Sequence, residues 1–134
     1  MYTNIEDFLN ELYRVINQAV FAGELPDLPV IVETGKPYKA VCRSSNNKPV
    51  GICISLDRIN RSDVVEDITG TVLHEMVHVY CIIHDIPHFD RSTGEHLPGF
   101  VQAAEEHGLY YDDFMNTNIL LLDAVQIVRA AGNG

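Results

Sequence analysis

The chain has 134 residues, of which 46% are hydrophobic and 21% are charged, a composition typical of one globular domain with a substantial core. Nineteen acidic residues against nine basic ones give a formal net charge of −10, which repels phosphate backbones and argues against general nucleic-acid binding. No segment approaches the roughly 20 apolar residues that a bilayer-spanning helix needs, so we expect no membrane association.

The cysteines and the N-terminal residues indicate a reducing compartment. Cys42, Cys53 and Cys81 form no Cys-x-x-Cys pair and are expected to be buried free thiols. The first residues have neither the positive charge nor the apolar run of a secretory signal. We therefore expect a cytoplasmic protein with a single domain over residues 1–134.

Residues 4 to 22 are predicted to form the first helix. Thr3 followed by Glu6 matches a capping box, and Gly23 gives a stop. Between them, apolar residues recur at helical spacing: Ile5, Phe8, Leu9, Leu12, Val15, Ile16, Val20 and Phe21. The prolines at 26 and 29 then exclude a continuing helix.

Three runs rich in β-forming residues follow, at residues 30–33, 38–42 and 50–56. Turn-forming residues separate them, and we predict a small, mostly antiparallel sheet. An edge strand of such a sheet can pair with an extended peptide, although a strand of this kind more often only builds the core.

The second predicted helix, residues 64 to 83 with Asp63 as its N-cap, contains the pattern His-Glu-x-x-His. His74 and His78 stand one turn apart on one helix face, where two imidazoles can bind one metal ion. Glu75 lies about 100° around from His74. There its carboxylate can act as a general base on a metal-activated water without being a ligand.

A catalytic zinc usually takes three protein ligands and leaves one position open, so a third ligand is sought downstream. His96 ends a polar loop, directly before a short helix predicted over residues 97 to 106, and a chain returning there can present its imidazole. Glu95, Glu105 and Glu106 are the alternatives for a His-His-Glu site, with Glu105 the first of them.

The other histidines fit less well. His84 has the spacing of the last histidine in H-E-x-x-H-x-x-G-x-x-H, but Cys81 occupies the glycine position. If the helix continues, His84 points about 120° away from His78. His88 and His107 are expected at the surface or as caps, with His107 and Gly108 ending the short helix.

The remaining expectations concern support for the site. Tyr110 and Tyr111 are candidates for holding an oxyanion, with packing the commoner role of such aromatics. Asp67, Asp85 and Glu95 are candidate carboxylate partners for the ligand histidines. A last amphipathic stretch is predicted as a C-terminal helix with these apolar residues: Phe114, Ile119, Leu120, Leu122, Val125 and Ile127.

Four segments together resemble the SprT-like zinc metallopeptidases. They are Phe21-Ala22-Gly23-Glu24-Leu25-Pro26, Ile54-Ser55-Leu56, Thr71-Val72-Leu73-His74-Glu75-Met76-Val77-His78 and Glu95-His96-Leu97-Pro98-Gly99-Phe100. The resemblance implies an α+β, zincin-like metallopeptidase domain. It spans most of the chain, from about residue 9 to residue 108.

By this resemblance, His74 and His78 are zinc ligands and Glu75 is the catalytic glutamate. The family's third ligand belongs to a His-Gly-x-x-Phe element, which maps to His96 and Phe100, although Leu97 replaces the glycine. The cysteine zinc ribbon of many members has no counterpart here, since the chain has no Cys-x-x-Cys. The best-known members degrade proteins crosslinked to DNA and use basic segments that this acidic chain lacks, so that substrate is not carried over.

We therefore expect a zinc-dependent peptidase acting on proteins or peptides. Zinc lowers the pKa of a bound water to about 7 and polarises the scissile carbonyl, while Glu75 takes the water proton and passes it to the leaving amine. Two other classes stay open: a zinc-containing binding module with little turnover, and a factor associated with nucleic-acid-bound proteins.

Overall fold

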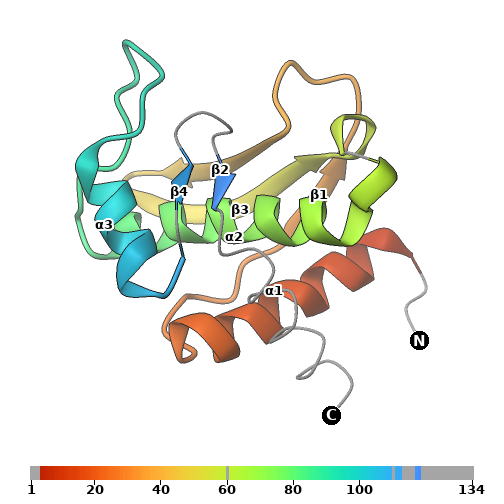
Figure 1. Cartoon of the computed structure of the whole chain (residues 1–134), viewed down its shortest axis with the longest axis horizontal. Coiled ribbons are helices and arrows are strands. Elements are labelled where there is room, and N and C mark those ends of the chain that lie inside the picture. Colours follow the sequence, from red (N-terminus) through yellow and green to blue (C-terminus); the bar gives the residue numbers. More distant parts are fainter. Residues whose placement is uncertain (1–3, 60, 110, 113–116, 119–134) are drawn as a thin grey trace.

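The chain has an α+β architecture in the computed structural model, which describes residues 4–59, 61–109, 111–112 and 117–118. Over these residues three α-helices accompany a three-stranded mixed sheet (Figure 1). The main elements are α1 (Ile5–Phe21), β1 (Val30–Glu33), β2 (Ala40–Ser45), β3 (Lys48–Ser55), α2 (Val64–Ile83) and α3 (Pro98–Glu106). Two short 3-10 turns, Leu56–Arg58 and Arg61–Asp63, link β3 to α2. None of the described helices is both long and apolar enough to cross a bilayer.

The predicted positions of the three helices are confirmed to within one residue, but the cap of the first was assigned wrongly. Asn4 is the N-cap of α1, and its side-chain oxygen accepts a hydrogen bond from the Asp7 N–H at 2.9 Å. Thr3 lies outside the described residues. At the other end, Ala22 and Gly23 both have positive φ, 53° and 75°, and the left-handed turn ends the helix.

Two asparagines of α1 hold the proline-rich segment against the helix. The Asn17 side chain donates to the Leu25 carbonyl at 2.9 Å and accepts from the Leu25 N–H at 3.1 Å. Asn10 makes the same pair of bonds with Val30, at 3.0 and 2.9 Å. The segment that cannot be helical is thereby fixed, and β1 starts at a defined place on α1.

The sheet is mixed, which corrects the mostly antiparallel arrangement expected from sequence. Its order is β1-β3-β2, with β3 antiparallel to β2 but parallel to β1. The chain leaves β1, forms β2 at the outer edge, and returns between them as β3. Asn46 and Asn47, both with positive φ, make the two-residue turn that reverses the chain. The strands therefore extend into residues expected to be loop.

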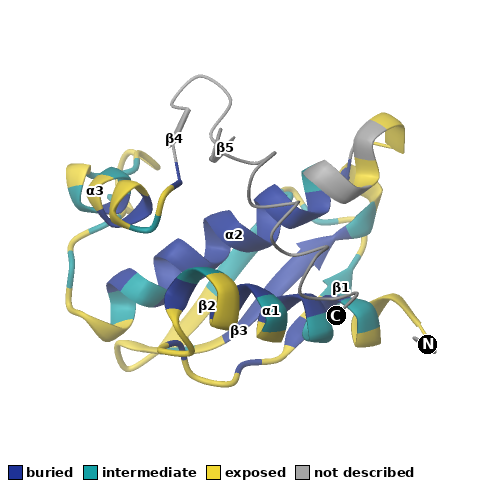
Figure 2. Ribbon diagram, turned by 60° about the horizontal axis from the view of Figure 1, so that its bottom comes forward, coloured by how far each residue is buried: buried dark blue, intermediate teal, exposed yellow. Residues whose placement is uncertain are grey.

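Both α1 and α2 lie on one face of the sheet, α1 against β1 and α2 against β2 and β3 (Figures 1 and 2). Every residue of α2 from 68 to 79 is buried, so the helix has no solvent-facing side there. The sequence predicted an apolar stripe on one side only. The additional cover comes from α3 and the loop before it, and it brings the polar residues of the His-Glu-x-x-His pattern into the interior.

The C-terminal helix predicted from the last amphipathic stretch lies almost wholly outside the described residues. Within that stretch, Thr117–Asn118 forms the short strand β5, which pairs with β4, Tyr111–Asp112. Those two residues are strand rather than helix. The expected cap of α2 by the Asp63 side chain also falls outside what is described.

Candidate metal centre

Three histidines converge on one point between α2 and the start of α3. His74 and His78 come from adjacent turns of α2, and His96 lies two residues before α3. Their candidate ligand atoms all lie within 4.8 Å of one another. His78 Nε2 is 3.2 Å from His96 Nε2, and two nitrogens held 2.0–2.1 Å from one tetrahedral zinc lie about 3.3 Å apart. The three histidines can therefore hold a metal ion.

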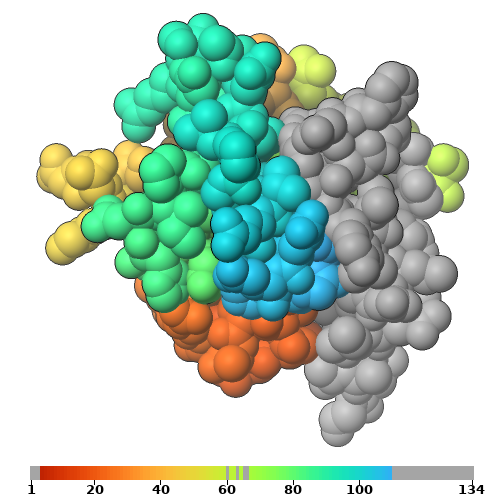
Figure 3. All heavy atoms as spheres, turned by 60° about the vertical axis from the view of Figure 1, so that its left-hand side comes forward, coloured from red at the N-terminus to blue at the C-terminus, as the bar shows by residue number. Residues whose placement is uncertain are grey.

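The loop that carries His96 is a small hairpin rather than an irregular segment. Phe89 and His96 form an antiparallel bridge, the Leu97 N–H donates to the His88 carbonyl at 3.0 Å, and further backbone bonds close the tip. Figure 3 shows this loop (teal) on the surface above α3. Both histidines of the hairpin are placed at its base, next to α2.

Phe100 forms an apolar floor under the three histidines. Its ring is fully buried, and its centroid lies 4.8, 4.5 and 4.5 Å from those of His74, His78 and His96. The neighbouring Gly99 lets α3 begin hard against the loop. A Cβ there would lie 2.4 Å from the carbonyl oxygen of Pro87, a distance that real Cβ atoms do not reach.

Burial keeps the two α2 histidines neutral. They are only 7% and 8% exposed, and burial, followed by the neighbouring histidines, lowers the pKa of His74 to about 3 and that of His78 to about 2. The pKa of half-buried His88 is lowered for the same reasons. Neutral imidazoles offer a lone pair to a metal ion without first releasing a proton.

Glu75 lies deep beside this cluster and is only 7% exposed. Burial raises the pKa of its carboxyl to about 8, while a hydrogen bond from the Cys42 backbone N–H lowers it in part. Cys42 belongs to β2, so the edge of the sheet touches the carboxylate directly. The sequence could place Glu75 on the helix but could not reveal this strand contact.

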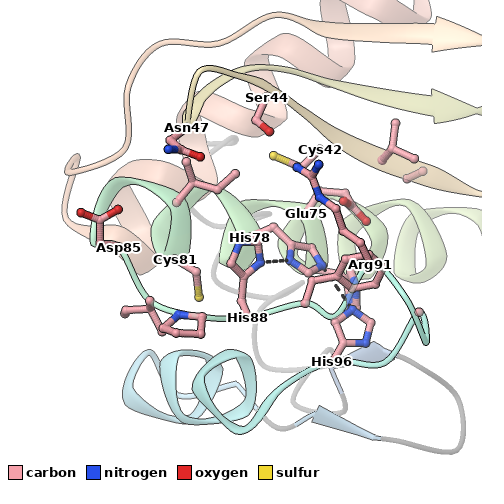
Figure 4. Close-up of a pocket in the computed structure, with 18 residues that line it drawn as sticks. Cys42, Ser44, Asn47, Glu75, His78, Cys81, Asp85, His88, Arg91 and His96 are labelled. Atoms are coloured by element: carbon pink, nitrogen blue, oxygen red, sulfur yellow. Dashed lines mark hydrogen bonds between the residues drawn. The ribbon is translucent and has the colours of Figure 1, made fainter.

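A cleft of about 610 Å³ opens onto the histidines and Glu75, a size suited to a small ligand or a few residues of peptide. β2 forms one wall, α2 the floor, and the hairpin loop the other wall (Figure 4). Polar side chains from the walls include Ser44, Asp85 and Arg91. The described part of the chain pairs no strand with the outer edge of β2, so that edge borders the cleft.

The alternative ligands lie elsewhere. α2 continues through Cys81 to Ile83, and His84 pairs with Glu24 instead of turning toward the cluster. Glu105 and Glu106 are exposed on α3, and neither joins the group of candidate ligand atoms found among the described residues.

The structure describes contacts for His107 and Asp67, which the sequence suggested as a cap and as a support for the ligand histidines. His107 caps α3 as expected, with Nδ1 2.8 Å from the Ala103 carbonyl. Asp67 pairs with Lys39. Tyr110 lies outside the described residues, as does the side chain of Tyr111.

His88 is the residue whose position the sequence missed. It was expected at the surface or as a cap, yet its Nδ1 lies 2.8 Å from Nδ1 of His78 (Figure 4). The signal that could have found it is the turn-rich segment between His88 and His96, since a hairpin brings its two ends together.

The chain matches no protein-family model, no curated protein and no solved structure. The site consists of three imidazoles around one point, the buried side chain of Glu75 beside them, and a cleft that reaches both.

Proposed function

We propose that the chain is a zinc-dependent metallopeptidase that hydrolyses peptide bonds of protein substrates, with a zincin-like catalytic domain of the SprT-like kind. The observation that carries the proposal is the convergence of His74, His78 and His96 on one point beside the buried carboxylate of Glu75. A purely structural metal site has no use for a general base next to its ligands.

Zinc is the ion proposed for this site because three imidazoles with room for a fourth ligand are typical of catalytic zinc. When bound, zinc acts as a Lewis acid that polarises the scissile carbonyl and brings the pKa of a coordinated water near 7. The protein's part is to hold His74, His78 and His96 against the buried ring of Phe100, with His74 and His78 kept neutral by burial.

Glu75 is proposed as the general base and then the general acid. Its carboxylate takes one proton from the attacking water as the carbon–oxygen bond forms, and the same proton passes to the leaving amine as the carbon–nitrogen bond breaks. Burial raises the pKa of Glu75 to about 8 in the metal-free chain, and the positive charge of a bound zinc ion would favour the carboxylate form that a general base needs. The Cys42 N–H, which donates to this carboxylate, orients it.

An extended polypeptide is the proposed substrate because the outer edge of β2, with which no described strand pairs, borders the cleft. The Ser55 N–H donates to the Lys39 carbonyl at 2.8 Å, and polar groups alternate along an antiparallel strand. The backbone groups of Ala40 and Cys42 consequently face away from β3. The Cys42 N–H donates to Glu75, so the groups proposed to pair with a peptide are the two carbonyls and the Ala40 N–H. A peptide can add to this edge by backbone hydrogen bonds, and the histidines line the same cleft.

The resemblance to SprT-like peptidases in the segments around His74 and His96 supports the same proposal. Leu97 replaces the glycine that follows the third ligand in that family, whereas Gly99 occupies the position here where a side chain cannot fit. The proposed compartment is the cytoplasm, because Cys42, Cys53 and Cys81 are free thiols.

The test is cleavage of unfolded casein by the zinc-loaded chain and by the Glu75→Gln variant, each assayed for metal content. We expect the wild type to cleave and Glu75→Gln to lose at least about 100-fold in rate, the scale of general acid–base catalysis, while it keeps its zinc. Equal inertness of both zinc-loaded proteins on every substrate tried would overturn the peptidase proposal and leave a zinc-containing binding module.

A further inference from the structure

We propose that His88 is a positioning residue for the metal centre: its Nδ1 accepts a hydrogen bond from the Nδ1–H of His78 and so fixes the tautomer and orientation of that ligand. The inference rests on the metal site of the proposed function, but not on peptidase activity. It gives a role to a histidine that belongs neither to the ligand set nor to a helix cap.

The two nitrogens of His78 have different neighbours. Nε2 lies 3.2 Å from Nε2 of His96, on the side where the ligand atoms converge. Nδ1 lies 2.8 Å from Nδ1 of His88, a normal hydrogen-bond distance. Figure 4 shows His78 between the two other rings, joined to each by a dashed line.

This arrangement determines which nitrogen carries the proton. A neutral imidazole has one N–H and one lone pair. If Nε2 of His78 gives its lone pair to the metal ion, the proton must reside on Nδ1, and a buried N–H needs an acceptor. Among the described residues, Nδ1 of His88 is the atom recorded within hydrogen-bond distance of His78 Nδ1. The proton of His88 must then reside on its own Nε2.

The partner is unusual because it is a second imidazole. A ligand histidine commonly donates its second N–H to a carboxylate, a backbone carbonyl or water, and such partners orient the ring and raise its basicity. A neutral imidazole orients His78 without adding negative charge near the ion. The candidate carboxylate Asp67 pairs with Lys39 instead.

His88 is itself held in place by the hairpin that carries His96. Its carbonyl accepts the Leu97 N–H at 3.0 Å, and the next residue, Phe89, forms the bridge to His96. One side of the hairpin's base therefore carries the ligand His96, and the other side carries His88, the hydrogen-bond partner of the ligand His78. Correct placement of His96 and correct orientation of His78 depend on the same short segment.

The experiment measures zinc affinity, by competition with a chelator, for the wild type and two variants of this position. His88→Ala removes the acceptor, and we expect affinity to fall about 10- to 100-fold, the usual effect of losing such a partner. His88→Asn places Oδ1 where Nδ1 was, and we expect affinity within a few fold of wild type. His84→Ala is the matched control, since His84 contacts Glu24 away from the cluster.

A second readout separates positioning from general loss of structure. In the zinc-loaded protein, the His78 Nδ1–H should give a downfield proton signal protected from exchange, absent in His88→Ala and present in His88→Asn. Unchanged affinity and an unchanged signal in His88→Ala would overturn the proposal. It is equally overturned if His88→Ala loses zinc as fully as His96→Ala, since His88 would then be a ligand.

These outcomes are distinguishable from failure of the proposed function. If the wild type binds zinc but cleaves nothing, the peptidase proposal fails. The expected weaker zinc binding of His88→Ala relative to wild type and His88→Asn is unaffected by that result. A wild type that cleaves casein while His88→Ala binds zinc normally removes only the role of His88.

Discussion

Glu75 and the two histidines beside it have pKa values displaced in opposite directions by the same cause, burial. In the metal-free protein the pKa of Glu75 is raised from 4.5 to about 8, while those of His74 and His78 fall from 6.5 to about 3 and about 2. Each group thus resists its charged form. The folded chain keeps a proton on Glu75 that the unfolded chain loses, and lacks two protons that the unfolded chain gains.

These displacements predict a stability maximum near pH 6.5 for the metal-free protein. Between pH 4.5 and 6.5 the unfolded chain holds two histidine protons that the folded chain lacks, and the folded chain holds one proton on Glu75 that the unfolded chain lacks. The unfolded chain therefore binds one proton more, and the free energy of unfolding rises with pH. Between pH 6.5 and 8 only Glu75 differs, and stability falls by up to about 1.4 kcal/mol per pH unit. Thermal unfolding of the chelator-treated wild type and of Glu75→Gln across this range checks it.

Glu75→Gln should rise more steeply with pH below pH 6.5, because the opposing proton of Glu75 is gone and the histidines alone differ, and it should lose the fall above pH 6.5. A fall of equal slope in the wild type and in Glu75→Gln would show that another group is responsible.

The sequence predicts residues of the site only as far as local geometry reaches. His74, Glu75 and His78 share two turns of one helix, so their relative placement follows from helical periodicity. His88 was misplaced because its contact with His78 depends on a hairpin folding back onto α2, which no helical or strand period encodes. The contact between Glu75 and Cys42 was missed for a similar reason, since it joins a helix to a strand distant in sequence.

At the scale of elements, the close packing of α3 against the loop before it determines the geometry of the histidine cluster. Gly99 lies where a Cβ would meet the Pro87 carbonyl oxygen at 2.4 Å and a methyl carbon of Ile86 at 2.6 Å. Pro87 directly precedes His88, and Phe100 directly follows Gly99. A side chain at this point must therefore move either the floor of the histidine cluster or the base of the hairpin.

We accordingly expect Gly99→Ala to destabilise the protein by about 1–3 kcal/mol, as overpacking does, and to weaken zinc binding measurably. Gln102→Ala, an exposed change on the same helix, should stay within about 0.5 kcal/mol and leave zinc affinity unchanged. Denaturant unfolding and chelator competition measure both effects. Wild-type zinc affinity in a destabilised Gly99→Ala would mean that α3 and the centre are not coupled in this way.

Element boundaries were more predictable from sequence than element pairing. Helices carry their own signals, such as Gly23 after α1 and Pro98 at the start of α3. Pairing in the sheet is not local: β3 returns between β1 and β2, a choice that hydrophobic alternation in each strand does not specify. The Asn46–Asn47 turn was present in the sequence as a hairpin signal, but the run around it was interpreted as a longer loop.

At the scale of the whole molecule, the fold buries a polar pattern that a surface helix would expose. The sheet covers α2 on one side, and α1, α3 and the hairpin cover much of the rest (Figure 2). That cover leaves His74 and His78 only 7% and 8% exposed and strengthens the electrostatic interactions among the histidines. Burying these polar groups costs folding free energy. A bound ion would offset that cost by stabilising the folded chain over the unfolded one.

The central claim is that His74, His78 and His96 bind one zinc ion, and the most direct measurement is the zinc content of the purified chain by mass spectrometry. Wild type should hold about one zinc per chain. His96→Ala should lose most of it, because two imidazoles alone bind zinc weakly, while Glu105→Ala should keep it. A full zinc ion retained by His96→Ala would contradict the account, and zinc lost only from Glu105→Ala would transfer the third ligand to α3.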